Sequence, residues 1–167
     1  MNRNKFIKSV GMASLIIPSF SMYAYVPKQE DPQIDKALVK KFVGASHSNY
    51  DVVKELLEEH PTLLNAAHDW KFGDFETGLG AASHVGYKEL VKYFLDQGAQ
   101  ANIFTAALFG KMNIIKPMLE FSPNLINAKG PHGFSLLHHA NKGGDEALEV
   151  AEYLKELGLT ETKFALY

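Results

Sequence analysis

Histidines and carboxylates are the side chains of this sequence that could do chemistry. The chain has seven histidines, and two of them lie close to acidic residues in the segment 68–84. An imidazole beside a carboxylate can exchange protons or bind a metal ion. One hypothesis is therefore a small metal-dependent or hydrolytic enzyme that uses the following cluster: His68, Asp69, Asp74 and His84.

The spacing of the histidines argues against a shared metal ion. His47 and His84 occupy equivalent places in two similar segments, and packed helices lie about 8–10 Å apart. Zinc needs its nitrogen ligands at about 2.0–2.1 Å, so we expect these two side chains to be too far apart. His138 and His139 are consecutive and would point about 100° apart on a helix. We therefore expect structural or surface histidines, no metal ligand and no cofactor.

Sequence motifs of known catalytic sites are also missing. The chain has no cysteine, which excludes disulfides, thiolate zinc sites and thiol catalysis. It has no glycine-rich phosphate loop, no His-Glu-x-x-His pair and no nucleophile elbow. Asp74 and Glu76 stand in a glycine-containing segment that we expect to be a solvated loop. We expect no catalytic residue and no enzyme.

Composition and charge are those of one ordinary globular domain. The 167 residues are 46% hydrophobic and carry a net charge of −2, so general disorder is excluded. The first 30 residues are basic, with four Lys or Arg residues against Glu30, and the rest of the chain is acidic. An acidic domain lacks the positive surface that nucleic acids require.

The N-terminus predicts export. Basic residues 3–8 precede an apolar stretch at residues 10–20, which is the order of a secretory signal and is too short for a comfortable membrane span. We predict an export signal or anchor at residues 1–26, a linker at residues 27–34 and a periplasmic location. The export route and cleavage of the signal stay open, and an N-terminal arm is the alternative.

A short phrase recurs along the chain. It is most complete at residues 81–86, Ala-Ala-Ser-His-Val-Gly, which are followed by an apolar segment at residues 90–95. Related phrases begin at Gly44, Ala106 and His138. Apolar residues at i, i+3 and i+4 follow each phrase, which predicts short paired helices. Such self-similarity indicates a stacked repeat protein.

Two segments carry a resemblance to a known family. Residues 77–82 (Thr-Gly-Leu-Gly-Ala-Ala) and 135–140 (Ser-Leu-Leu-His-His-Ala) resemble the Thr-Pro-Leu-His-x-Ala signature of ankyrin repeats. The chain is similar over residues 35–158 to exported bacterial ankyrin-repeat proteins of unassigned activity. The resemblance implies an all-α solenoid of about four helix-turn-helix repeats with short β-turn fingers, followed by a tail at residues 159–167. It implies protein binding and no reaction.

Irregular spacing locates the expected binding surface. Equivalent apolar positions are 38, 24 and 35 residues apart, at Val53, Val91, Ile115 and Val150, whereas about 33 residues are usual. The long first interval leaves room for an extended finger, and the short second interval leaves almost none before Phe109.

Three large aromatic residues stand in this finger: Trp70, Phe72 and Phe75. They either fold back onto the helices or expose at least one ring as an anchor, since aromatic residues dominate binding hot spots. We expect a monomeric, non-catalytic protein-interaction module, and an inhibitor or immunity-type accessory of an exported enzyme is an alternative. The expected partner-binding residues are Trp70, Phe72, Asp74, Phe75, Glu76, His84, Leu108, Phe109, His132, Asn141 and Lys142.

Overall fold

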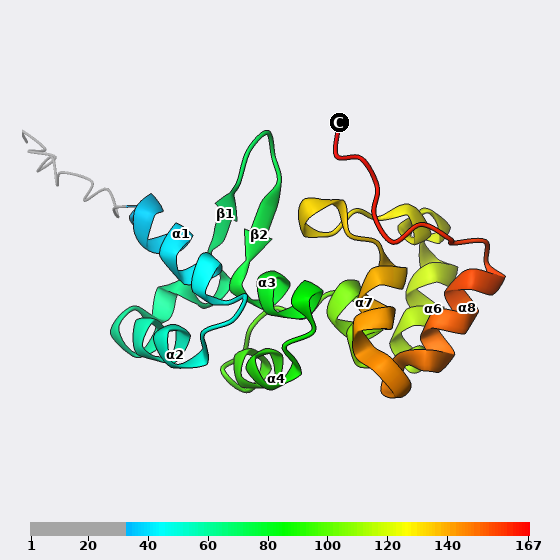
Figure 1. Cartoon of the computed structure of the whole chain (residues 1–167), viewed down its shortest axis with the longest axis horizontal. Helices are drawn as coiled ribbons and strands as arrows, with labels where there is room; N and C mark the ends of the chain where they lie inside the picture. Colours follow the sequence, from blue (N-terminus) through cyan, green and yellow to red (C-terminus); the bar gives the residue numbers. More distant parts are fainter. Residues whose placement is uncertain (1–32) are drawn as a thin grey trace, which may run out of the picture. The chain divides into compact units, whose positions relative to one another are not determined.

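The computed structural model describes residues 33–167 (Figure 1). The predicted export signal at residues 1–26 lies outside the described residues. The described part contains eight α-helices: α1 Lys36–Ala45, α2 Tyr50–Glu59, α3 Gly78–Val85, α4 Lys88–Asp96, α5 Ile103–Leu108, α6 Met112–Phe121, α7 Leu136–Gly143 and α8 Leu148–Glu156. It also contains two strands, β1 Ala67–Asp69 and β2 Phe75–Thr77, and four 3₁₀ segments: η2 Pro61–Asn65, η3 Pro123–Asn127, η4 Pro131–Gly133 and η5 Gly144–Ala147.

The helices pack in pairs along the chain. Helix α1 packs on α2, α3 on α4, α5 on α6 and α7 on α8. The first members of the pairs also contact one another in order, from α1 through α3 and α5 to α7. Each of these four begins at a polar cap whose side-chain oxygen accepts a backbone N–H, which satisfies an otherwise unpaired donor. The caps are Asp35, Thr77, Asn102 and Ser135.

An antiparallel hairpin joins α2 and η2 to α3. Its register pairs Ala67 with Thr77, His68 with Glu76 and Asp69 with Phe75. In its turn, the Asp69 carboxylate accepts the backbone N–H of Gly73 at 3.1 Å. Side chains alternate across a strand, so Phe75 faces outward while Asp74 and Glu76 face inward and are buried.

This hairpin overturns the expected fold class. The described chain is mostly helical but carries a two-stranded antiparallel sheet, so the all-α prediction is wrong. The regular four-repeat solenoid is not supported either, because each connection between helix pairs is built differently. The first contains η2 and the hairpin, the second is a six-residue segment at 97–102, and the third contains η3 and η4. Helical periodicity predicts helices, but it does not report how the intervening segments fold.

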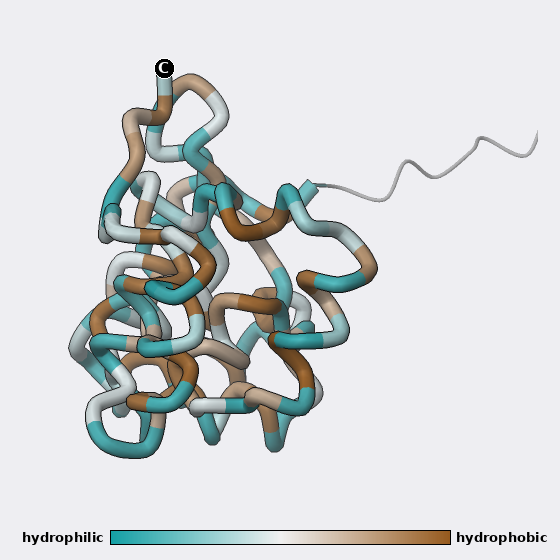
Figure 2. Tube along the Cα trace, turned by 90° about the vertical axis from the view of Figure 1, so that its right-hand side faces the viewer, coloured by the Kyte–Doolittle hydropathy of each residue, from teal (hydrophilic) through white to brown (hydrophobic). Residues whose placement is uncertain are grey.

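Apolar side chains of the helices form two core clusters, one mainly in the N-terminal half and one in the C-terminal half. The apolar residues alternate with polar ones along the chain (Figure 2). Leu108 and Phe109 belong to the first cluster and are buried. The expectation that both side chains are exposed is therefore wrong, because the end of α5 and the residue after it turn them toward the core.

His139 is a buried histidine in the core of the C-terminal half. Its Nδ1 lies 2.8 Å from the carbonyl oxygen of Ser135, and its Nε2 has no hydrogen-bond partner among the described residues. Burial lowers the pKa of His139 to about 4, because the charged imidazolium is poorly solvated there.

This burial makes stability depend on pH. The unfolded chain takes up a proton at His139 near the ordinary histidine pKa of about 6.5, whereas the folded chain does so only at about 4. The free energy of unfolding therefore decreases as the pH is lowered from about 6.5 to about 4. Between pH 7 and 4.5 we expect the wild type to lose about 2–3 kcal/mol more than His139→Asn. Urea unfolding at both pH values, with a chelator present, measures this, and parallel losses in the two proteins would contradict it.

The C-terminal tail lies against the segment that precedes α7. The backbone N–H of Phe164 donates to the carbonyl of Gly133 at 2.8 Å, and the Ser135 hydroxyl donates to the carbonyl of Glu161 at 2.6 Å. The tail therefore helps to hold the loop that carries His132. In the described part of the chain, no helix is both long and apolar enough to cross a bilayer.

Candidate metal centre

Four side chains from four separate segments converge beside the hairpin. His47 follows α1, Glu76 lies in β2, His84 lies in α3 and His132 lies in η4. One donor atom from each of them lies within 4.8 Å of the other three. Three imidazole nitrogens and one carboxylate oxygen are all established zinc ligands.

Several distances within this group are close to those between the ligand atoms of a zinc ion. Nε2 of His84 lies 3.1 Å from Nε2 of His47 and 3.0 Å from Oε1 of Glu76. Oε2 of Glu76 lies 3.6 Å from Nε2 of His47 and 3.5 Å from Nε2 of His132. A tetrahedral zinc ion with bonds of about 2.0–2.1 Å separates its ligand atoms by about 3.3–3.4 Å. The four spacings bracket this value, with both oxygens of Glu76 taking part, and the whole set of donors lies within 4.8 Å.

The outer nitrogens of two histidines have partners that orient their rings. Nδ1 of His47 lies 3.1 Å from the carbonyl oxygens of both Val43 and Gly44. Nδ1 of His132 lies 2.8 Å from Oδ2 of Asp74. In each pair the imidazole donates through Nδ1–H, which leaves Nε2 as the inward-facing lone pair. A carboxylate or carbonyl behind a histidine is the usual support of a metal ligand.

Glu76 is a buried carboxylate whose two oxygens differ in their hydrogen bonding. Its Oε2 accepts the indole N–H of Trp70 at 2.7 Å. Its Oε1 is buried and makes no hydrogen bond within the described region, although Nε2 of His84 is close. Burial raises the pKa of Glu76, but the nearby side chains of His84 and Trp70 and the charge of His47 outweigh it and hold the pKa below its usual value. An ionised, unsatisfied oxygen therefore faces three imidazoles, and a cation would satisfy it.

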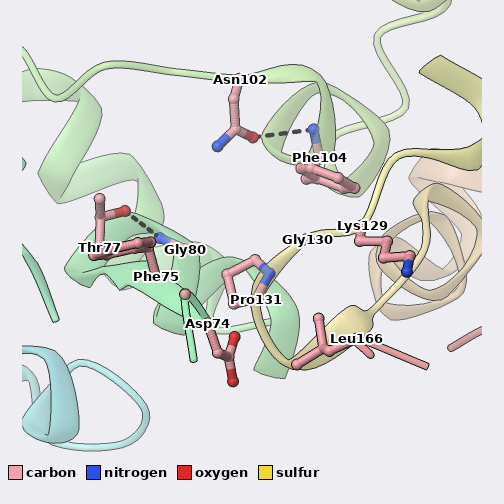
Figure 3. Close-up of a pocket in the computed structure, with 11 residues that line it drawn as sticks. Asp74, Phe75, Thr77, Gly80, Asn102, Phe104, Lys129, Gly130, Pro131 and Leu166 are labelled. Carbon is pink, nitrogen blue, oxygen red and sulfur yellow. Dashed lines mark hydrogen bonds between the residues drawn. The ribbon is translucent and has the colours of Figure 1, made fainter. Parts of the chain in front are cut away.

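Asp74 ties the hairpin to the loop before α7. Besides its bond to the His132 ring, its Oδ1 accepts the backbone N–H of His132 at 2.8 Å. Burial raises the pKa of Asp74, but these His132 bonds outweigh it and lower the pKa overall. His132 has φ of 57°, a left-handed conformation that costs a non-glycine residue about 1–3 kcal/mol. The two bonds to Asp74 hold this strained residue with its ring toward Glu76. In Figure 3 Asp74 of the hairpin lies beside Pro131, which belongs to the same loop as His132.

The hydrogen bonds by which Asp74 orients His132 give a specific prediction. We expect Asp74→Asn to weaken zinc binding by about 10- to 100-fold, since the ring of His132 loses its charged acceptor. The matched control is Asp69→Asn in the same hairpin, which bonds only the turn amide of Gly73 and should leave affinity unchanged. Competition with a chromophoric chelator measures both affinities. Equal affinities for the two variants would contradict the assignment.

The cluster is closed on one side and open on the other. The Glu76 side chain is fully buried and that of His84 is 9% exposed, whereas those of His47 and His132 are each 27% exposed. The ring of Phe134 stacks on His84 with centroids 5.1 Å apart. The carbonyl of His84 lies 2.8 Å from Nε2 of His138. An ion would therefore reach the centre past the two partly exposed imidazoles.

The structure corrects the expectation that His47 and His84 are too far apart to share an ion. Helix axes stay apart, but an imidazole reaches several ångströms from its Cα, so two rings can meet between neighbouring helices. The expected solvated position of Asp74 and Glu76 is also wrong, because the hairpin folds both carboxylates inward. The earlier hypothetical cluster is not assembled either: His68 and Asp69 lie outside the group formed in the described chain.

The expected partner-binding residues fall into three classes of exposure. Phe72 and Phe75 on the hairpin are 89% and 63% exposed, and Asn141 and Lys142 at the end of α7 are also exposed. Trp70 and His132 are half-buried. The others are buried: Asp74, Glu76, His84, Leu108 and Phe109.

Sequence reasoning noted every member of the cluster but did not join them. The equivalent positions of His47 and His84 were the available signal, because equivalent positions on neighbouring helices face the same side. Nothing local indicated that His132, 48 residues after His84, would complete the set.

Comparison with protein families and with curated proteins found no match. The resemblance to ankyrin repeats therefore depends on its motifs alone. The expectations of a non-catalytic protein, a protein partner and an extracytoplasmic location stay predictions.

Proposed function

We propose that this protein binds one divalent transition-metal ion, preferentially zinc, through His47, Glu76, His84 and His132. The observation that carries the proposal is the convergence of four metal-binding donor atoms within 4.8 Å. A buried carboxylate oxygen without a hydrogen-bond partner among them supports it. Imidazole and carboxylate ligands suit zinc, and also Cu(II) and Ni(II), better than they suit calcium or magnesium.

The proposed ion acts as a cross-link. Three ligands come from residues 47–84, around the first core cluster, and His132 comes from the loop before α7 in the second half. Four protein ligands fill a tetrahedral shell, which is the pattern of structural zinc sites. A chain without cysteine cannot form disulfides, and a metal cross-link of this kind replaces their stabilising effect.

Metal stoichiometry and ligand variants test the proposal. The purified chain is stripped with a chelator, titrated with Zn²⁺ and analysed for bound metal, and Co²⁺ is used as a spectroscopic substitute. We expect one ion per chain and the intense visible absorption of tetrahedral Co²⁺. His84→Ala should weaken zinc binding by more than about 100-fold, which exceeds the loss of about 10- to 100-fold expected when a residue that only supports a ligand is replaced.

The control for His84→Ala is His60→Ala. His60 is exposed and its nearest charged group is Glu59 at 3.9 Å, so this variant should bind zinc like the wild type. Substoichiometric zinc in the wild type, or equal zinc affinities for the two variants, would refute the proposed site.

A second candidate function is protein interaction through the hairpin. Phe72 and Phe75 favour it, because two large apolar side chains stand exposed on one short segment, and such groups serve as binding anchors. A photoreactive phenylalanine analogue at position 72 should crosslink one defined protein in the native compartment. The same analogue at the exposed Phe121 is the control, and identical crosslinks from both positions would refute the candidate.

A further inference from the structure

A groove of about 790 Å³ lies between α4 and α6, away from the metal centre. Its floor is formed by Ile103, Ala106 and Phe109, and Leu95, Ile114 and Met118 form its sides. The two helices do not pack closely on each other within the described chain. Leu95 and Phe109 belong to the first core cluster, whereas Ile103, Ala106 and Met118 belong to the second. The groove is thus the open seam between the two clusters.

The seam leaves apolar side chains uncovered. Ile114 is 42% exposed, and Leu95 and Met118 are half-buried. A contiguous apolar lining of this kind usually marks a place where something binds. The volume falls within the range of about 300–1,000 Å³ that is typical of small-ligand pockets.

Positive charge lies at the rim of the groove. Lys92 and Lys111 line it together with a single carboxylate, that of Glu146. This carboxylate is already bonded to Nζ of Lys88 at 2.9 Å. In the described residues neither Lys92 nor Lys111 forms an ion pair. Nζ of Lys92 lies 5.9 Å from the ring centroid of Phe109, so an ammonium group stands directly over the apolar floor.

We propose that this groove binds a single-chain amphiphile with an anionic headgroup, such as a long-chain carboxylate. The apolar chain lies between α4 and α6 along Ile114 and Met118, and the headgroup pairs with Lys92 and Lys111. The charge of the rim selects an anion over a neutral or cationic amphiphile of the same length. None of the groove residues is a ligand of the metal centre, so this binding is independent of zinc.

The test uses the full chain and a fluorescent long-chain carboxylate, displaced by dodecanoate below its micelle-forming concentration. We expect saturable binding of one molecule per chain, with equal affinity in zinc and in chelator. Lys92→Gln/Lys111→Gln should weaken binding by about tenfold. Ile114→Gln should weaken it by a similar factor through the apolar side, since Ile114 is already partly exposed and its substitution leaves the core intact.

The matched control is Lys40→Gln/Lys41→Gln, which removes the same charge from exposed positions on α1 and should bind like the wild type. Equal loss of carboxylate affinity in the two double-lysine variants would overturn the proposal, because the loss would then follow from the change in net charge alone. Equal displacement by dodecyltrimethylammonium would also overturn it. So would the absence of saturable binding, including the case in which an acidic amphipathic peptide binds and dodecanoate does not.

Discussion

Zinc should raise the free energy of unfolding by about 4 kcal/mol when the free ion is present at about 1,000 times its dissociation constant. The reason is that the four ligands lie together only in the folded chain, where residues 47 and 132 are brought to one place. Binding therefore adds directly to folding. Urea unfolding with zinc and with a chelator measures the difference.

Two variants control this result. His132→Ala removes the ligand contributed by the second half, so zinc should stabilise it far less than the wild type. His60→Ala keeps all four ligands and should show the full zinc effect. Identical unfolding curves for the wild type in zinc and in chelator would contradict the cross-link, even if the ion binds. Acidification should reduce the zinc effect as well, since protons compete for the imidazoles.

Leu108→Ala should cost about 2–5 kcal/mol of stability. Leu108 is fully buried at the end of α5, so its truncation leaves a cavity between packed helices. The control is Leu148→Ala, whose side chain is 55% exposed and whose loss should cost less than about 1 kcal/mol. Chemical unfolding in chelator gives both values without a contribution from the metal. Similar costs for both variants would contradict the assignment of Leu108 to the core.

The helices were predictable because their causes are local. Apolar spacing and the cap at Asp35 act within a few residues, and both are readable from a short window of sequence. The two strands were not predicted, since each has only three residues and their pairing depends on the length of the turn between them.

The candidate metal centre could not be predicted because its decisive contacts are distant in sequence. Asp74 meets His132 across 58 positions, and His47 meets His84 across 37. Estimating the gap between two histidines from helix spacing ignored the reach and direction of their rings. The sequence motifs were sufficient to place residues on helices, but not to say which side chains would face one another.

The alternation along the hairpin has a consequence for how this segment can change in evolution. Asp74 and Glu76 share one face because the period of a strand is two residues, and Phe75 stands on the other face. An insertion or deletion of one residue between Glu76 and α3 would shift the register of β2, turn both carboxylates to solvent and bring the ring of Phe75 toward the histidines. Descendants that keep the centre should therefore vary the length of this segment only at its tip, or by two residues at a time.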